Sequence, residues 1–230
     1  MSKIGIIGNG FVGSAISYGF SLYVDEVKIY DTDPRRSTHS LEDIASDFLG
    51  DSIIAIKSTV VPGTLESLVK RYPNLNFVFN PEFLTERTAK LDFINTARIV
   101  IGSNKAKNND VVESLYRIRF PHTQIIKTDL ATAQLIKYMA NCFFSTKVSF
   151  MNEMYQICEA VGANWQEAVN GFLSDGRIGN SHIDVPGHDK DFGFGGKCFP
   201  KDLNAMIMRS TELGIKPTVM KAVWEKNKEV

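Results

Sequence analysis

Three glycines near the N-terminus constrain the fold of this chain more than any other feature of its sequence. Gly8, Gly10 and Gly13 stand in the spacing G-x-G-x-x-G. They follow a short apolar stretch at residues 4–7, and a helix-like stretch separates them from a second apolar stretch at residues 27–30. A strand, a glycine loop, a helix and a second strand in this order form the fingerprint of a dinucleotide-binding unit. We therefore predict an α/β domain of the Rossmann type.

Each part of the fingerprint has a role in holding a dinucleotide. Gly8 allows a tight turn, and Gly10 lets the main chain approach a pyrophosphate. Gly13 lets the helix pack closely on the strand. The first helical residues, Phe11 and Val12, would present N–H groups to the phosphates at the positive end of the helix dipole.

An acidic residue ends the second predicted strand. Asp31 comes 18 residues after Gly13. Its carboxylate can accept hydrogen bonds from both ribose hydroxyls and would repel a 2′-phosphate, so it favours NAD over NADP. Arg36 follows closely in the sequence, either as a further cofactor contact or as a solvated surface charge.

Apolar stretches continue the α/β pattern to about residue 128. The further predicted strands are residues 52–57, 77–79, 98–101 and 123–126. Ser58 and Thr59 end the first of these, and hydroxyls at the carboxyl end of a parallel strand face the ligand crevice of such folds. Glu82 and Glu86 follow the next strand. Their spacing of four residues is compatible with two residues of a site and equally with an acidic face in solvent.

The overall composition excludes several classes of function. The chain has 230 residues, is 43% hydrophobic and 23% charged, and has a formal net charge of zero, so nothing in it favours nucleic acid or a membrane as a partner. Three cysteines without a framework, and no leader or membrane-spanning stretch, favour a cytoplasmic location. His182 and His188 are six residues apart without further ligands, so we expect no metal site.

From about residue 129 the pattern becomes helical. Residues 129–161 contain neither proline nor glycine and are apolar on more than one face. We predict that this helix is the core of a second domain and the interface of a homodimer. Lys137 and Asn141 are four residues apart and share a face, and the lysine either extends to solvent or points into a site.

A glycine-rich loop near the C-terminal end carries a cysteine. Residues 193–202 read GFGGKCFPKD. Pro200 suits the first turn of a helix, which places Cys198 just before the helix N-terminus, where the thiolate is favoured. Lys197 and Lys201 would act in the same direction. The alternative is a glycine loop that holds an inert buried cysteine.

Together these motifs resemble those of the UDP-glucose/GDP-mannose dehydrogenases, NAD-dependent enzymes that oxidise a nucleotide sugar to its uronic acid. The matching motifs run in family order through nearly the whole chain, at residues 8–13, 58–64, 80–84 with Glu86, 98–102, 135–141, 150–153, 175–179 and 193–202. The resemblance implies a Rossmann-type NAD-binding domain at residues 1–128. It implies an all-helical dimerisation domain of the 6-phosphogluconate dehydrogenase type at residues 129–230, which carries the cysteine loop.

The resemblance also implies a chemistry in two hydride transfers. Cys198 matches the family nucleophile, which forms a thioester that water then hydrolyses. Lys137 and Asn141 match the pair that stabilises the oxyanion. Asp202 matches the acid that orients the lysine and a water, and Glu82 matches the acid that assists hydrolysis of the thioester.

Further positions match contacts to the two ligands. On the cofactor side they are Ser58, Thr59 and Glu86, and Thr59 also matches a catalytic hydroxyl that holds a water. On the substrate side, main-chain contacts match Phe83, Leu84, Gly193 and Gly195, besides the side chains of Lys137 and Asn141.

The chain departs from the family pattern in two places. Family members continue past the central helix into a second α/β domain, whereas this sequence ends at residue 230. One strand–helix unit, with its Val-Pro-Thr-Pro strand end, is also missing between Asp43 and Ser52. We therefore predict that strand 52–57 occupies the vacated position beside strand 4–7.

Three functions remain open at this stage. The first is a short nucleotide-sugar 6-dehydrogenase of polysaccharide biosynthesis, with UDP-glucose as the expected substrate. The second is a catalytically inactive or partner-dependent NAD-binding dimeric scaffold. The third is a short-substrate dehydrogenase of the 6-phosphogluconate type, against which the cysteine loop argues.

Overall fold

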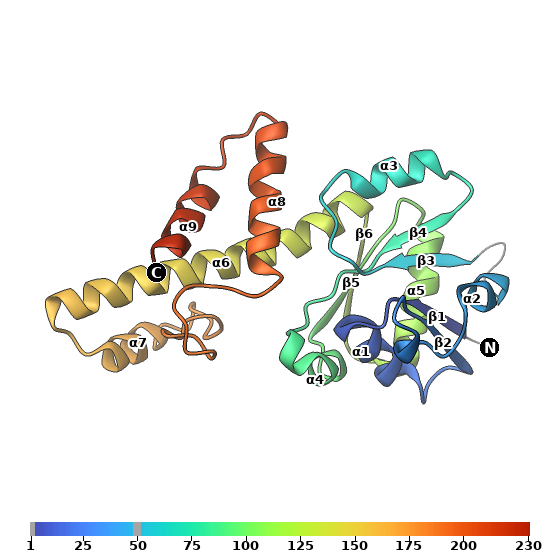
Figure 1. The fold of residues 1–230 in the computed structure, drawn as a ribbon, viewed down its shortest axis with the longest axis horizontal. Helices are drawn as coiled ribbons and strands as arrows, with labels where there is room; N and C mark the ends of the chain where they lie inside the picture. Colours follow the sequence, from blue (N-terminus) through green and yellow to red (C-terminus); the bar gives the residue numbers. More distant parts are fainter. Residues whose placement is uncertain (1–2, 48–51) are drawn as a thin grey trace. The chain divides into compact units, whose positions relative to one another are not determined.

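The computed structural model describes residues 3–47 and 52–230 (Figure 1). The chain divides into two compact units, Met1–Lys137 and Tyr138–Val230, and each is described by itself. The boundary that the sequence predicted, between residues 128 and 129, falls at the start of helix α6 (Leu130–Val161), whereas the two units meet inside that helix.

The first unit alternates strands and helices, as expected for an α/β domain. Its strands are β1 (Lys3–Ile7), β2 (Glu26–Tyr30), β3 (Ile53–Ile56), β4 (Asn76–Phe79), β5 (Arg98–Gly102) and β6 (Gln124–Thr128). Its α-helices are α1 (Phe11–Phe20), α2 (Leu41–Asp47), α3 (Thr64–Arg71), α4 (Ala89–Ile94) and α5 (Ala106–Arg119), with short 3₁₀ turns η1 (Pro34–Arg36) and η2 (Glu86–Thr88). The unit also includes the first turns of α6.

The strands of the first unit form two hydrogen-bonded groups. β1 and β2 pair in parallel, and the second group has the order β3-β4-β5-β6. In the second group β4 and β5 run antiparallel, while the other pairs are parallel.

The prediction that strand 52–57 lies beside strand 4–7 is therefore wrong for the residues that the structure describes. In the described strands β3 stands at the end of the order β3-β4-β5-β6, and no ladder bond joins its other edge to β1, which pairs with β2. The crossover through α3 accounts for the pairing of β3 with β4, because a strand, a helix and a parallel strand connected in sequence pack as one unit. Residues 48–51, inside the segment with the expected deletion, lie outside the described residues.

Aromatic rings fill the core between the helices and the sheet. Phe20 of α1 makes edge-to-face contacts with Phe93 of α4 and Tyr116 of α5. Gly19 permits this packing, because a Cβ at this position would lie 2.2 Å from the Phe93 ring. The core thus fixes α1, and with it the glycine loop that precedes α1.

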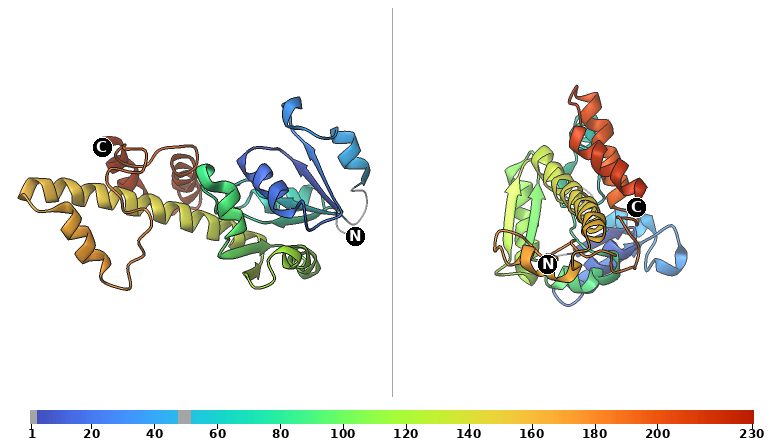
Figure 2. Two further views of the ribbon diagram at one scale, coloured as in Figure 1. Left: turned by 90° about the horizontal axis from the view of Figure 1, so that it is seen from below. Right: turned by 90° about the vertical axis from the view of Figure 1, so that its left-hand side faces the viewer.

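The second unit is helical, as predicted. It contains most of α6, followed by α7 (Trp165–Leu173), α8 (Phe199–Glu212) and α9 (Thr218–Glu229). Figure 2 shows α6 as one uninterrupted helix, and it spans 32 residues. Phe194, Leu203 and Val223 form a buried cluster that joins the cysteine loop to α8 and α9. Among the described residues, no helix is long and apolar enough to cross a membrane.

Candidate functional site

The glycine loop between β1 and α1 has the geometry that the fingerprint predicts. Gly8 has φ +95°, and its N–H donates to Tyr30 O at 2.8 Å. A Cβ at Gly13 would lie 2.1 Å from Gly8 O, so only glycine lets α1 pack on the loop. A Cβ at Gly10 would meet no described atom within 4 Å, and no described side chain caps α1. The main chain here is therefore open to an anion at the helix N-terminus.

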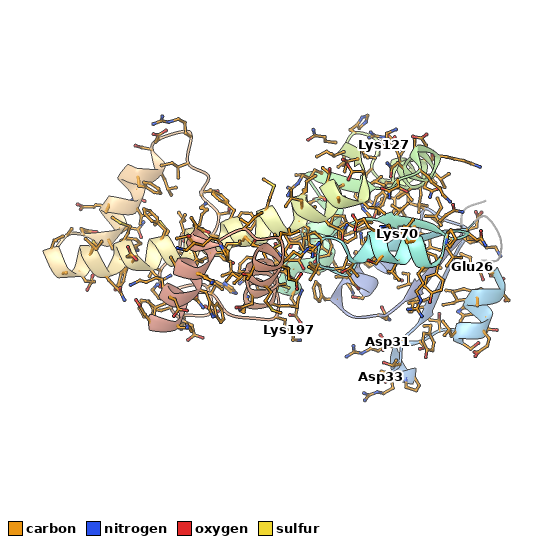
Figure 3. The ribbon with its side chains drawn as sticks, turned by 90° about the horizontal axis from the view of Figure 1, so that it is seen from above. Glu26, Asp31, Asp33, Lys70, Lys127 and Lys197 are labelled. Carbon is orange, nitrogen blue, oxygen red and sulfur yellow. The ribbon has the colours of Figure 1, made fainter. Side chains whose placement is uncertain are left out.

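Asp31 lies beside this loop at the end of β2. Its Oδ1 accepts from Asp33 N at 2.9 Å and its Oδ2 accepts from Asn9 N at 2.6 Å. These hydrogen bonds lower the pKa of Asp31, and the charge of Arg36 acts in the same direction. Figure 3 shows Asp31 and Asp33 next to one another. The carboxylate is thus held ionised, with lone pairs left for ribose hydroxyls.

Two further observations bear on whether the loop fits a dinucleotide. Asn9 Nδ2 donates to Arg36 O at 2.8 Å, while Asn9 Oδ1 is buried without a partner among the described residues. Such an acceptor is expected where a ligand hydroxyl completes the hydrogen bonding. With the open backbone of Gly10 and the ionised Asp31, the loop fits the group. Sequence reasoning missed Asn9, whose signal is its position between Gly8 and Gly10.

The other residues predicted on the cofactor side lie in less enclosed places. Ser58 is exposed and Thr59 is partly buried, and both lie in the segment that follows β3. Glu86 is exposed at the start of η2. The Arg36 side chain is exposed, with Nε 3.7 Å from Asp33 Oδ2, so the described contact between Arg36 and the loop uses its main chain. Cofactor contacts of these four side chains stay predictions.

A buried ion pair occupies the turn after β4. Lys137 Nζ donates to Glu82 O at 2.6 Å and to Glu82 Oε1 at 3.2 Å. The two residues are 4% and 8% exposed. Glu82 Oε2 accepts from Leu84 N at 2.7 Å, and Lys137 Nζ lies 5.4 Å from the centroid of the Phe83 ring. Glu82 is therefore not part of a solvated acidic face, and Lys137 does not extend to solvent.

A second polar cluster lies at the start of α8. Asn141 Nδ2 donates to Asp202 Oδ2 at 2.5 Å, and Asp202 is 1% exposed. Asp202 N donates to Cys198 O at 2.9 Å, which ties this acid to the turn that begins at Cys198. Lys201 forms an ion pair with Asp202. Lys201, one of the two lysines expected to favour a thiolate, thus contacts the acid. The lysine that Asp202 was expected to orient is Lys137, whose described hydrogen bonds go to Glu82.

Cys198 is the N-cap residue of α8, and Pro200 lies in the first turn, as predicted. No described side chain caps this helix. Cys198 is partly buried. By contrast, burial raises the pKa of Cys142 to about 12, and Cys158 is buried. A helix N-terminus favours the thiolate of Cys198, the nucleophilic form, whereas the neighbouring acid Asp202 opposes it in part, and the other two cysteines suit packing.

Two asparagines hold the cysteine loop from outside it. Asn227 Oδ1 accepts from Phe194 N at 2.6 Å, and Asn227 Nδ2 donates to Phe194 O at 3.0 Å. Asn152 Oδ1 accepts from Gly193 N at 3.1 Å. Gly193 has φ +72°, and a Cβ there would lie 2.7 Å from Asn227 Oδ1. Sequence reasoning missed both asparagines, because no local pattern links them to the loop.

The structure thus brings the predicted residues together in separate groups. Glu82 and Lys137 form one pair in the first unit, and Asn141, Asp202 and Cys198 form a cluster in the second. Lys137 and Asn141 lie on consecutive turns of α6. In the part of the chain that the structure describes, no group of three or more potential ligands could hold a metal ion.

The fold and these groups define a class: an NAD-binding α/β domain followed by a helical domain with a cysteine loop. Residues 36–119 match the NAD binding domain of the UDP-glucose/GDP-mannose dehydrogenase family, and residues 131–229 match its central domain. The chain belongs to this family. The predicted family and the predicted cofactor, NAD, are both confirmed.

Curated relatives agree with this assignment. The chain is 37% identical over 183 residues to a UDP-glucose 6-dehydrogenase of Rickettsia conorii, and the matched stretch covers 78% of this chain and 41% of the relative. It is 38% identical over 187 residues to a UDP-glucose 6-dehydrogenase of Bacillus subtilis, and the matched stretch covers 78% of this chain and 39% of that relative. The matched part of the chain thus spans about two fifths of the length of these relatives.

Solved structures confirm the predicted fold class. The UDP-glucose dehydrogenase from Pyrobaculum islandicum matches with a TM-score of 0.82 and 23% identity, over 100% of this chain and 68% of that chain. A 3-hydroxyisobutyrate dehydrogenase of Mycobacterium tuberculosis matches with a TM-score of 0.73 and 14% identity, over 97% of this chain and 91% of that chain. At these identities the likeness concerns the fold alone.

Proposed function

We propose that this chain catalyses the NAD-dependent oxidation of a nucleotide sugar to its uronic acid, with UDP-glucose as the first substrate to test. The observation that carries the proposal is the cluster at the start of α8, where Cys198 precedes the helix and Asp202, buried in its first turn, bonds Asn141. The names of the curated relatives support UDP-glucose as the substrate. Polysaccharide biosynthesis is the process that such an activity would serve.

The proposed reaction uses the chain's own residues as follows. NAD, when bound at the glycine loop, accepts the hydride in each of the two oxidations. The first converts the C6 alcohol to an aldehyde, with loss of a hydride and a proton. The Cys198 thiolate then adds to the aldehyde carbon, and Lys137 and Asn141 stabilise the oxyanion. Loss of a second hydride from this carbon leaves a thioester on Cys198.

Hydrolysis completes the proposed sequence. Water attacks the thioester carbon, the carbon–sulfur bond breaks, and the Cys198 thiol is restored as the carboxylate leaves. Glu82 is assigned to assist the attacking water, and Asp202 to orient the amide of Asn141 and a water. Thr59 is assigned to the nicotinamide side. Main-chain groups of Phe83, Leu84, Gly193 and Gly195 are assigned to the substrate.

We further propose that the protein is a homodimer through α6. Apolar side chains that recur at helical spacing along this helix are exposed, among them Met139 at 62%, Phe143 at 62% and Val161 at 71%. A stripe of this kind suits burial against a second copy. Sedimentation equilibrium of the wild type and of F143E would test the interface, because a charge in the stripe should shift the protein to monomer. We propose a cytoplasmic location on the composition alone.

A second candidate function is an NAD-binding scaffold without catalysis. The observation that favours it is that Lys137 Nζ and both carboxylate oxygens of Glu82 are engaged with one another and with Leu84 N rather than presented to a reacting group. This candidate keeps the glycine loop and Asp31 but assigns no chemistry to Cys198.

The deciding experiment follows NADH absorbance with UDP-glucose, GDP-mannose and UDP-N-acetylmannosamine. We expect the wild type to form two NADH per sugar. We expect C198A to form no uronic acid. The matched control is C158A, which removes a buried thiol whose described hydrogen bond goes to Ala163 O, outside the cluster, and should retain activity. Binding of NAD without turnover of any of the three sugars would favour the scaffold.

A further inference from the structure

Lys57 is a lysine inside the first unit for which neither the fingerprint nor the proposed reaction has a use. It directly follows β3 and is partly buried. Its Nζ donates to Asn80 O at 2.9 Å and to Asn80 Oδ1 at 2.8 Å. It also lies 3.3 Å from the Tyr116 hydroxyl. A single amine therefore holds both the main chain and the side chain of one asparagine.

The asparagine that Lys57 holds is bonded on every side. Asn80 is buried, and its N–H donates to Ile56 O at 2.9 Å. Its Nδ2 donates to Val100 O at 2.7 Å, and the Tyr116 hydroxyl donates to its Oδ1 at 2.5 Å. Asn80 thus joins β3, β5 and α5 at the point where β4 ends.

The turn that starts at Asn80 carries the buried ion pair. Only Pro81 separates Asn80 from Glu82, whose main-chain and side-chain oxygens both accept from Lys137. The two lysines are close enough to interact: burial lowers the pKa of Lys57 to about 7, the charge of Glu82 opposes this shift, and the charge of Lys137 adds to it.

Packing alone does not hold this turn. A cavity of about 30 Å³ borders it, lined among others by Lys57, Glu82, Arg98 and Tyr116. The turn is therefore fixed on this side by the hydrogen bonds of Asn80. In its charged or its neutral form, the Lys57 amine can donate to both Asn80 oxygens.

We propose that Lys57 is a positioning residue that holds Glu82 against Lys137 by fixing Asn80. Methionine has a similar length but no donor, so K57M would remove the Lys57 hydrogen bond from Asn80 O and leave Asn80 Oδ1 with the Tyr116 hydroxyl as its donor. The turn would then relax and the Glu82–Lys137 pair would open. The part of this inference that concerns the oxidation rests on the proposed function. The part that concerns the geometry of the Glu82–Lys137 pair does not.

The first test needs no turnover. Acetylation of lysines by an N-hydroxysuccinimide ester is followed by mass spectrometry, and the labelling rate of Lys137 is divided by that of Lys28. Lys28 is paired with Asp47 in the same unit and reports general opening of that unit. We expect this ratio to rise about tenfold in K57M, the effect of about one lost buried hydrogen bond.

Two further variants keep this test decisive. K105M is the matched control, because Lys105 also donates to an asparagine of β4, Asn76 Oδ1 at 3.0 Å, but at an exposed site. Its ratio should equal that of the wild type. K57R retains donors, but in a larger and planar head group, so its ratio should lie between those of the wild type and K57M. An unchanged ratio in K57M, or a rise in K57R as large as that in K57M, would overturn the proposal. If K57M does not fold, a ratio in K57R equal to that of the wild type would overturn it.

The second test uses turnover with the substrate that the wild type accepts. We expect K57M to lower kcat with little change in KM for NAD, and to accumulate a thioester that intact-protein mass spectrometry detects on Cys198. Equal losses in every kinetic step would indicate a merely structural role and count against the proposal. If the wild type oxidises no nucleotide sugar, the proposed function fails, whereas the labelling ratio still decides the role of Lys57.

Discussion

Two glycine loops of this protein precede helices, and they are held in different ways. The loop before α1 is fixed by its own neighbourhood: Gly8 N bonds Tyr30 O, Asn9 N bonds Asp31, and Gly13 packs on Gly8. The loop before α8 is fixed by side chains from α6 and α9, which lie at distant positions in the sequence. The first loop is therefore a local motif, whereas the second depends on the packing of the whole helical unit.

The two loops also share a feature that suits them to chemistry. No described side chain caps α1 at Gly10 or α8 at Cys198. Free N–H groups at a helix N-terminus stabilise negative charge. In the first loop the charge expected is that of the phosphates, and in the second it is that of a thiolate. An uncapped helix N-terminus thus stabilises the charge of a ligand in the first loop and that of a side chain in the second.

The largest expected effect concerns the local loop. G13A places a Cβ 2.1 Å from Gly8 O, a main-chain atom that cannot move away cheaply. We expect the free energy of unfolding to fall by about 3 kcal/mol, the upper range for overpacking, and NAD binding to be lost. Chemical denaturation and calorimetric titration would measure these.

The matched control for this prediction is G10A. Its Cβ would meet no described atom within 4 Å, so its stability should be close to that of the wild type while NAD binding weakens. If G13A and G10A were equally stable, the close packing of α1 on the loop would not be what fixes it.

The next effect concerns the loop that is held from a distance. N227A removes both hydrogen bonds to Phe194 and leaves a buried N–H and C=O unsatisfied. We expect a loss of about 2 kcal/mol of stability and a change in the rate at which iodoacetamide alkylates Cys198. NAD affinity should not change.

N227D is the comparison variant, since it retains the acceptor for Phe194 N but sets a carboxylate oxygen against Phe194 O. Because two acceptors then face one another, its stability should be no higher than that of N227A. Loss of NAD affinity in N227A would mean that the two loops are not independent, and would break the comparison.

Asp31 sharpens the cofactor side of the comparison. D31N removes the charge that repels a 2′-phosphate, so we expect about tenfold weaker NAD binding, as for loss of a charge-assisted hydrogen bond, and a smaller preference for NAD over NADP. Because the pKa of Asp31 lies below its usual value, NAD affinity of the wild type should be unchanged from neutral pH down to mildly acid pH. Fluorescence titration with both dinucleotides would measure this, and an unchanged preference in D31N would contradict it.

The smallest effect concerns Lys57, whose pKa is lowered to about 7. Above pH 7 the folded chain has released a proton that the unfolded chain retains until its ordinary lysine pKa. Raising the pH therefore favours the folded state. Relative to K57M, the wild type should gain about 1 kcal/mol between pH 7 and pH 8. Urea denaturation at the two values would show this, and a flat difference would mean that Lys57 stays charged.

Much of the first unit could be predicted from the sequence, but its sheet could not. The glycine spacing and Asp31 identified the cofactor loop, because φ at Gly8 and packing at Gly13 are local requirements. The position of β3 was predicted wrongly, because strand pairing is a choice among distant partners. Lys57 and Asn9 were missed, since a lysine after a strand or a residue between glycines has no distinctive pattern.

The sequence by itself determined where the loops and helices begin, which residue types stand at the strand ends, and the family to which the chain belongs. Backbone preferences of glycine and proline act within a few residues, so they can be read along the chain. Only the tertiary structure decided that Asn227 holds Phe194, that Lys57 holds Asn80 and that Glu82 is buried against Lys137. These contacts join residues 23 to 55 positions apart, and their partners are set by the packing of whole elements.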